Sequence, residues 1–445
     1  MRVRLFRFQK ALRSGIWFLP SLLTALSVVL AFIIVAVDEQ VRVADRTWLP
    51  LSLDISADGA RGMVSVIAGS MLSLAGIAFS STLVVLSLSA STYTPRVLRN
   101  FTDDRSSQTV LGSMLATFVY CLLVLRTIQS DEPPFVPVLA TAVAVLFALI
   151  DLGLFIYFIH HIAESIQVAH ITANIAHETK HNLDKLVDEH AGAHPDNDWA
   201  CREADRLQDT RGALVPSHQS GYIVAVEMHG LLDVAVQHNL QFVVEHDIGD
   251  FIAEGAPLVS VYPAAELDET VAKKVRELFI LGSQRTLHQD PAFGVRQLVD
   301  IAIRALSPAV NDVTTAVNCL DYIGDILRHA ATCQFPSRYR GDHEGRVRIV
   351  IEVSTFESYL DLGFDQIRVA GQVQVAVVVR MLEVAADLAL IATSSEQRDA
   401  LARHADLIRR AADASLKDVA DREKVDREAA RLGVALSQTA PASGE

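Results

Sequence analysis

The sequence contains few cysteines, and no two of them are spaced as a C-x-x-C pair. The four are Cys121, Cys201, Cys319 and Cys333. We therefore expect reduced thiols and no disulfide framework. Basic residues are also fewer than acidic ones, so the formal net charge is −14. That deficit argues against a nucleic-acid partner, since phosphate binding requires a basic face.

Charged side chains are sparse before His160, where four long apolar runs lie. The runs cover residues 16–37, 63–90, 110–128 and 136–158. About 20 apolar residues suffice for a helix to cross the hydrocarbon core of a bilayer. The first run is too long for the apolar part of a signal peptide, and charged residues follow it in place of a small-residue cleavage site. We therefore predict a four-helix transmembrane domain over residues 16–160, embedded in a lipid bilayer.

Lysine and arginine are distributed unevenly among the loops between these runs. Residues 1–15 carry five basic side chains and no acid, and the loop after the second run carries Arg96, Arg99 and Arg105. The other two loops carry more acids than bases. Because loops rich in lysine and arginine stay in the cytoplasm, we expect both termini to be cytoplasmic in a cell inner membrane. The basic N-terminus is interleaved with apolar residues, which predicts an amphipathic helix on the inner leaflet.

The second apolar run has one face of small residues. They recur at steps of three or four: Gly62, Ser65, Gly69, Ser73, Gly76 and Ser80, continued by Ser87 and Ser91. Ser81 and Thr82 add hydroxyl groups near the middle of the membrane. Small residues let helix backbones approach closely in lipid, so one interpretation is helix packing. The other is a pore-lining or oligomer-facing surface, and both can hold in a homo-oligomer.

Asp151 lies within the fourth apolar run. Counting from Val136 places it about 22 Å along the helix, in the inner third of the membrane. A carboxylate there is costly unless it has a partner or contacts water, which makes Asp151 a candidate pore residue. The alternative is a structural pair with a hydroxyl or basic group near the inner interface.

The helical pattern continues through residues 161–190 and contains the motif His177–His181, HETKH. This matches the H-E-x-x-H pattern of zinc metalloproteases, in which two histidines bind the metal and the glutamate acts as base. Lys180 departs from the uncharged residues usual in that motif, and no convincing third ligand follows. Five side chains share one helix face and could bind a metal weakly or remain a solvated polar surface: His170, His177, His181, Asp184 and Asp188. We therefore expect no enzyme, with the protease as a third and least favoured function.

The remaining chain predicts a C-terminal α+β cytoplasmic domain. A polar linker at 191–216 precedes a β-rich unit at 217–263, whose segment GDFIAEGAPLVSV resembles the end of a barrel-sandwich hybrid domain. No lysine lies between Leu214 and Val271, which excludes a lipoyl- or biotinyl-type arm. Residues 264–435 are expected to be mainly helical, with a strand near 346–353, and residues 436–445 disordered. The predicted fold class is thus an α-helical membrane protein with an α+β domain containing a small barrel-sandwich-like unit.

A polar motif lies between two helices of that domain. Arg296, Asp300 and Arg304 are spaced by four residues, which predicts a charge ladder along one helix. Pro308 should end this helix, and Asn311 or Asp312 should cap the next. Ser307 lacks the glycine elbow and placed histidine of a nucleophilic serine. We interpret the motif as structural.

Three segments resemble a known bacterial family. They are GIAFSSTLVVLSLSASTYTPRVLRNF, IHHIAESIQVAHI and QRTLHQDPAFGVRQLVDIAIRALSPAVNDVTTAVNCLDYI. They are similar to predicted membrane proteins catalogued as domain of unknown function 2254, over about residues 10–435. The resemblance implies a bacterial inner-membrane protein and supplies neither catalytic residues nor a ligand.

Two classes of function fit these features best. The first is a homo-oligomeric channel or transport pore, whose acidic cytoplasmic domain would favour cations by raising their local concentration. The alternative is a membrane-anchored sensory or scaffolding protein that binds a cytosolic protein partner. The sequence has no P-loop, kinase signature or basic patch that would identify such a partner, and it implies no cofactor.

Overall fold

The computed structural model describes residues 17–41, 56–92, 104–129, 135–165, 167–189, 202, 206, 212–287 and 289–438. The chain divides into two compact units, Met1–His170 and Ile171–Glu445. The predicted N-terminal amphipathic helix lies outside the described residues, as do most of the 191–216 linker and the last seven residues of the predicted disordered tail, 439–445. Residues 436–438 still belong to a helix.

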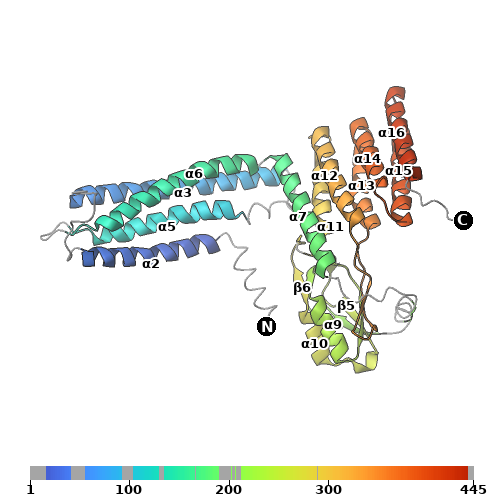
Figure 1. Ribbon diagram of the computed structural model, residues 1–445, viewed down its shortest axis with the longest axis horizontal. Helices are drawn as coiled ribbons and strands as arrows, with labels where there is room; N and C mark the ends of the chain where they lie inside the picture. Colours follow the sequence, from blue (N-terminus) through green and yellow to red (C-terminus); the bar gives the residue numbers. More distant parts are fainter. Residues whose placement is uncertain are drawn as a thin grey trace. The chain divides into compact units, whose positions relative to one another are not determined.

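In the part of the N-terminal unit that the structure describes, four long helices lie side by side (Figure 1). They are α2 (Phe18–Val41), α3 (Ala57–Thr92), α5 (Arg105–Thr127) and α6 (Val138–Ser165). Each is long and apolar enough to cross a membrane, which confirms the four candidate spans. Helix α3 begins before the predicted residue 63, because Asp58 in its first turn lies where the helix dipole favours an acid.

Helix α5 packs against the other three helices of this unit. A Cβ added at Gly112 would lie 2.8 Å from the Pro20 Cα, so α2 and α5 approach at this glycine. Asp38 at the end of α2 accepts hydrogen bonds from the first backbone N–H groups of α6, at Leu139 and Ala140. Asp104 caps the start of α5 and lies 3.1 Å from His161 near the end of α6. These end contacts place α5 antiparallel to α6, and α6 antiparallel to α2.

The fourth span was expected either to continue as a helix or to break slightly after residue 160. Helix α6 ends at Ser165, and α7 (Val168–Glu189) begins as a separate helix. The two compact units divide within the first turn of α7, after His170. The break between α6 and α7 therefore lies close in sequence to the boundary between the units.

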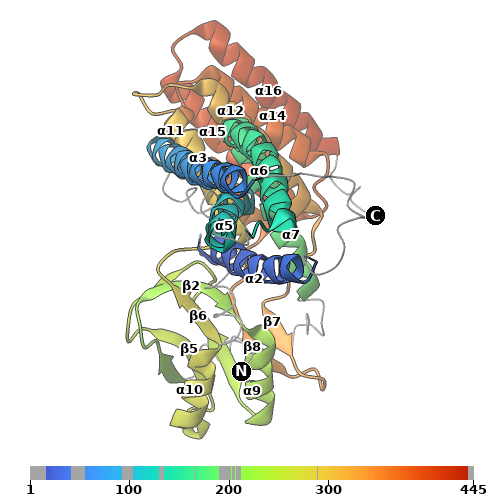
Figure 2. The ribbon, with the colours of Figure 1, turned by 90° about the vertical axis from the view of Figure 1, so that its left-hand side faces the viewer.

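The described residues of the C-terminal unit form two sheets (Figure 2). The five-stranded sheet has the order β1-β5-β3-β8-β7, and the three-stranded sheet has the order β4-β2-β6. Strands β3 and β8 pair in parallel, and the other pairs are antiparallel. The strands are β1 (Ala213–Pro216), β2 (Gly221–Val226), β3 (Gln241–Val244), β4 (Phe251–Ile252), β5 (Pro257–Tyr262), β6 (Phe279–Gly282), β7 (Tyr339–Gly341) and β8 (Val347–Val350).

The two sheets extend beyond the β-rich unit predicted at 217–263. Strands β6, β7 and β8 come from the segment predicted to be mainly helical, so the sheets join distant parts of the chain. Within the predicted β unit, Met228–Gln237 forms helix α9, because Leu231, Val234 and Ala235 are spaced to bury one helical face. The barrel-sandwich detail is not confirmed. The strand predicted near 346–353 is β8.

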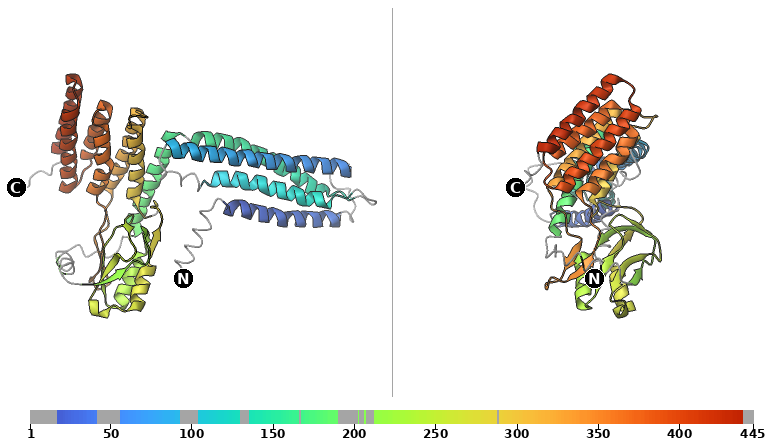
Figure 3. Two further views of the ribbon diagram at one scale, coloured as in Figure 1. Left: turned by 180° about the vertical axis from the view of Figure 1, so that it is seen from behind. Right: turned by 90° about the vertical axis from the view of Figure 1, so that its right-hand side faces the viewer.

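Helices α9 and α10 (Glu269–Glu277) pack on these strands, and one apolar core joins them. A short 3-10 turn, η1 (Ala264–Glu266), precedes α10. Between residues 289 and 438, six further helices pack successively on one another (Figure 3). They are α11 (Pro291–Ala305), α12 (Val313–Thr332), α13 (Phe356–Gly371), α14 (Val375–Ala389), α15 (Ser395–Ser415) and α16 (Val419–Gln438).

Candidate functional site

Helix α3 has two faces with different surroundings. Its buried positions pack inside the N-terminal unit: Ala60, Val64, Ala68, Met71, Ala75, Ala78 and Val85. Its predicted small-residue face is exposed: Gly62, Ser65, Gly69, Ser73, Gly76, Ser80 and Ser87. At about 100° per residue, these two sets lie on opposite sides of the helix. The small-residue face is therefore not the one that packs within the subunit.

The small-residue face of α3 is open. Among the described residues, a Cβ added at Gly62, Gly69 or Gly76 would meet no atom within 4 Å. A surface groove with a volume of about 610 Å³ follows this face and includes Ser73 and Ser80. The Ser73 hydroxyl donates a hydrogen bond of 2.9 Å to the Gly69 carbonyl oxygen, so part of its polarity is satisfied within the helix.

Ser81 and Thr82 are half-buried beside this open face. Ser81 still lines the groove, whereas the Thr82 hydroxyl donates to the Ala78 carbonyl oxygen at 2.9 Å. The hydroxyl cluster expected at mid-membrane is therefore split between the groove and the helix backbone.

Asp151 is fully buried on α6. Its Oδ1 accepts a hydrogen bond of 2.5 Å from the Ser113 hydroxyl of α5. This is the hydroxyl pair anticipated as the structural alternative. Asp151 does not line the groove on α3, so the structure does not bring these two sets of pore candidates together.

The HETKH motif lies on α7, and its sides have different roles. Thr179 is fully buried and packs against Gly294 of α11, while Lys180 pairs with Asp325 of α12 at 2.5 Å. His177 and His181 are exposed, as is His170. Among the described residues, no side chain completes a three-ligand group with these histidines. One side of the motif therefore packs against neighbouring helices, and its histidines lie on the exposed side.

The polar motif between α11 and α12 forms hydrogen bonds to the backbone at the ends of the two helices. Asp312 caps α12 by accepting a hydrogen bond of 3.0 Å from the Thr315 backbone N–H. Asn311 precedes it with a φ of 49°, a left-handed conformation that asparagine tolerates. The Ser307 hydroxyl donates to the Arg304 carbonyl oxygen at 2.7 Å. Arg296, Asp300 and Arg304 are partly buried along α11, and their charge ladder stays a prediction.

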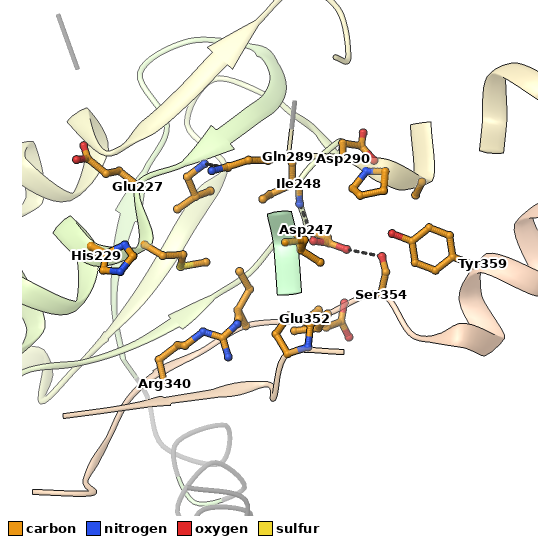
Figure 4. Close-up of a pocket in the computed structure, with 18 residues that line it drawn as sticks. Glu227, His229, Asp247, Ile248, Gln289, Asp290, Arg340, Glu352, Ser354 and Tyr359 are labelled. Atoms are coloured by element: carbon orange, nitrogen blue, oxygen red, sulfur yellow. Dashed lines mark hydrogen bonds between the residues drawn. The ribbon is translucent and has the colours of Figure 1, made fainter. Parts of the chain in front are cut away.

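A pocket in the C-terminal unit was not anticipated from the sequence. Its cavity volume is about 290 Å³, and Figure 4 shows its lining. The walls come from the end of β2, α9, the loop after β3, the start of α11, β7, the end of β8 and α13, with Leu186 of α7. Its principal ionisable side chains are Glu227, Asp247, Asp290, Arg340, Glu352 and Tyr359. They come from separate parts of the sequence, so spacing alone could not reveal the pocket.

Asp290 fixes one wall of this pocket. It caps α11 through the Phe293 backbone N–H at 3.0 Å, and Arg285 binds both of its carboxylate oxygens at 2.8 and 3.0 Å. The loop after β3 approaches this pair at Gly249, where φ is +97° and an added Cβ would lie 2.5 Å from Asp290 Oδ2. Only a glycine fits that position. The Asp-Pro pair that starts α11 was the available sequence signal for this cap.

Asp247 and Arg340 lie on other walls of the pocket. Asp247 Oδ1 accepts from the Ile248 backbone N–H at 2.7 Å, and the Ser354 hydroxyl lies 3.4 Å from Oδ2. The buried Nε of Arg340 has no hydrogen-bond partner among the described residues. Burial lowers the pKa of Arg340 to about 10, so it remains charged at neutral pH. The pocket thus offers carboxylates and the charged guanidinium group of Arg340 to a polar ligand.

We expect Asp247→Asn to stabilise the C-terminal unit above pH 6. Burial raises the pKa of Asp247 from 3.8 to about 6, and Asp290 and Asp250 add repulsion. The native state therefore binds more protons than the unfolded state between these values, so stability falls as pH rises through this window. The variant should gain about 1–3 kcal/mol at pH 7.

This gain is measured by chemical denaturation of the full-length protein in detergent, with hydrogen exchange of residues 291–305 as the readout. Glu352→Gln, at an exposed position of the same pocket, is the matched control and should leave the pH profile unchanged. If Asp247→Asn has the same dependence of stability on pH as the wild type, the raised pKa of Asp247 is contradicted.

Comparison with known proteins identifies the family. A family model described as "Predicted membrane protein (DUF2254)" matches residues 13–387. Uncharacterized proteins of Mycobacterium bovis and Mycobacterium tuberculosis are each 30% identical over 381 residues, which cover 84% of this chain and 72% of each relative. No solved structure matches the chain. The matched region includes parts of both compact units, and the chain therefore belongs to the DUF2254 family of predicted membrane proteins.

Proposed function

We propose that the protein is a homo-oligomeric channel or transport pore of the cell inner membrane, with copies meeting through α3. The observation that carries this proposal is the open glycine and serine face of α3. In lipid, small residues at helical spacing allow close backbone approach, which van der Waals contacts and interhelical hydrogen bonds then stabilise. Such a face left exposed on one copy fits a second copy.

In a ring of copies, the edges of this face would contact the neighbouring α3 helices. Its hydroxyl groups, with Ser73 and Ser80 along the groove, would then line the ion path. The excess of basic residues in the N-terminal segment supports a cytoplasmic N-terminus and C-terminal unit. The net charge of −14 supports a preference for cations. In this proposal, Asp151 stabilises the contact between α5 and α6 through its hydrogen bond with Ser113. A contribution of Asp151 to ion conduction stays a prediction.

Ion flux through liposomes containing the purified protein tests the pore. We expect cation flux from the wild type and at least tenfold less flux from Ser80→Leu, because the leucine side chain replaces a hydroxyl with bulk in the groove. Thr82→Val is the matched control, since the Thr82 hydroxyl bonds within its own helix. Wild-type protein that conducts no ion at any voltage or membrane tension would exclude the pore.

A second candidate function is a sensor, and the pocket of the C-terminal unit favours it. Asp247 and Glu352 could bind an amine or hydroxyl groups, and the Arg340 guanidinium group could bind an anionic group of the same ligand. A small zwitterionic or hydroxyl-rich ligand matches this set. Thermal-shift measurements with free amino acids as probes should show a shift that Asp247→Asn removes. If no free amino acid shifts the melting temperature, the pocket does not bind this class of ligand.

A further inference from the structure

Three side chains of different chemistry gather between α7 and α12. They are Asp184 of α7, His329 in the last turn of α12 and Cys333 at the C-terminal cap of α12. Their ligand atoms all lie within 4.8 Å of one another. His329 Nε2 and Asp184 Oδ1 are already joined at 2.7 Å. This set differs from the exposed histidines of the HETKH motif.

The helices hold this set in register through a second contact. Lys180 and Asp325 pair one turn before Asp184 and His329 on the same two helices. Residues four apart share a helix face, so the first pair fixes the position of the second. His329 and Cys333 are also four residues apart, which brings the imidazole and the thiol to the same side of α12. The contacts between α7 and α12 therefore hold the three side chains close to one another.

The spacing suits a tetrahedral metal ion. Zinc bonds of roughly 2.0–2.3 Å place neighbouring ligand atoms about 3.3–3.8 Å apart. Shifts of about 1 Å would therefore bring the three ligand atoms to metal distance, and the ion would replace the hydrogen that now joins His329 to Asp184. A thiolate and an imidazole together favour zinc and related transition metals over magnesium and calcium, which take oxygen ligands.

We propose that Asp184, His329 and Cys333 form a binding site for a transition-metal ion of the zinc class, with solvent as fourth ligand. The Cys333 thiol gives its proton to solvent when the sulfur binds the ion, and His329 binds through its neutral Nε2. Asp184 supplies one carboxylate oxygen. The bound ion joins α7 to the end of α12, next to the loop that leads to Pro336 in the wall of the pocket.

Cobalt(II) serves as a spectroscopic probe for this site. We expect the full-length protein, stripped with chelator and titrated with cobalt(II), to give visible d–d bands and a near-ultraviolet thiolate-to-metal band. Cys333→Ser should remove the thiolate band. Asp184→Asn and His329→Gln should each weaken cobalt binding by about tenfold or more. Zinc(II) added afterwards should displace cobalt and bleach the spectrum.

Two controls keep the test specific and independent of folding. The double variant His177→Gln/His181→Gln, in the exposed face of α7, should titrate as the wild type does. His329→Cys retains a metal ligand and should strengthen the thiolate band. A wild-type protein with no cobalt bands would overturn the proposal, and so would a thiolate band that survives Cys333→Ser or disappears in the double histidine variant.

Discussion

Gly294→Ala should destabilise the C-terminal unit by about 3 kcal/mol, the upper range for overpacking a core. The Cβ of the new alanine would lie 1.8 Å from Thr179 Oγ1 and 3.0 Å from Leu287 Cδ2. Thr179 is fully buried, and its hydroxyl also donates to the Ile175 carbonyl oxygen at 2.6 Å, so it has little room to move. Helices α7 and α11 must therefore separate. Chemical denaturation of the full-length protein in detergent measures the loss.

A rescue and a control accompany this substitution. Thr179→Ala removes the oxygen that would overlap, so it should restore part of the stability of Gly294→Ala in a double-mutant cycle. Gly433→Ala, in α16, has no atom within 4 Å of the added Cβ among the described residues. That change should stabilise its helix by about 0.5–1 kcal/mol. Equal effects of the Gly294 and Gly433 substitutions would contradict the packing assigned to the HETKH motif.

Gly76→Leu should convert the proposed assembly to single subunits while leaving each subunit folded. The glycine lies on the open face of α3, where a leucine meets no atom of its own subunit but prevents another backbone from approaching closely. We expect the dissociation constant to rise by at least about tenfold, which corresponds to 1.4 kcal/mol. Native mass spectrometry in detergent reports the change directly.

The neighbouring residue supplies the contrast for this experiment. Ala75 is buried in a cluster with Ala78, Val110, Met114 and Phe158. Ala75→Leu should therefore lower the stability of the subunit itself by overpacking this cluster. If Gly76→Leu unfolds the subunit as Ala75→Leu does, or leaves the assembly intact, the open face of α3 is not where copies meet.

The membrane half was predictable because its signal is strong and local. Each span is a long apolar run, and hydropathy responds directly to the energy of transferring a helix into lipid. The small-residue face of α3 was also visible as a repeat along the chain. Its direction was not visible, because a repeat shows which residues share a face and does not show what that face contacts. Asp151 is a similar case, since its partner Ser113 lies on another helix.

The C-terminal half was less predictable because its structure depends on distant contacts. Strand β3 pairs with β8, which lies about a hundred residues later in the chain. Helix α9 contains β-branched and apolar residues in a short run, where strand and helix patterns are hard to separate. The pocket and the Asp184–His329–Cys333 cluster each join separate elements. The spacing of His329 and Cys333 is visible in the sequence, but the approach of Asp184 is not, and no spacing marks the pocket.

Ion flux through liposomes carrying a single cysteine on α3 tests the proposed pore most directly. The four native cysteines are first replaced, and Ser80→Cys is compared with Phe79→Cys, whose side chain points about 100° away on the same helix. A charged thiol reagent should abolish flux through Ser80→Cys and leave flux through Phe79→Cys unchanged. No flux from either protein, or equal sensitivity of the two to the reagent, would contradict a pore lined by α3.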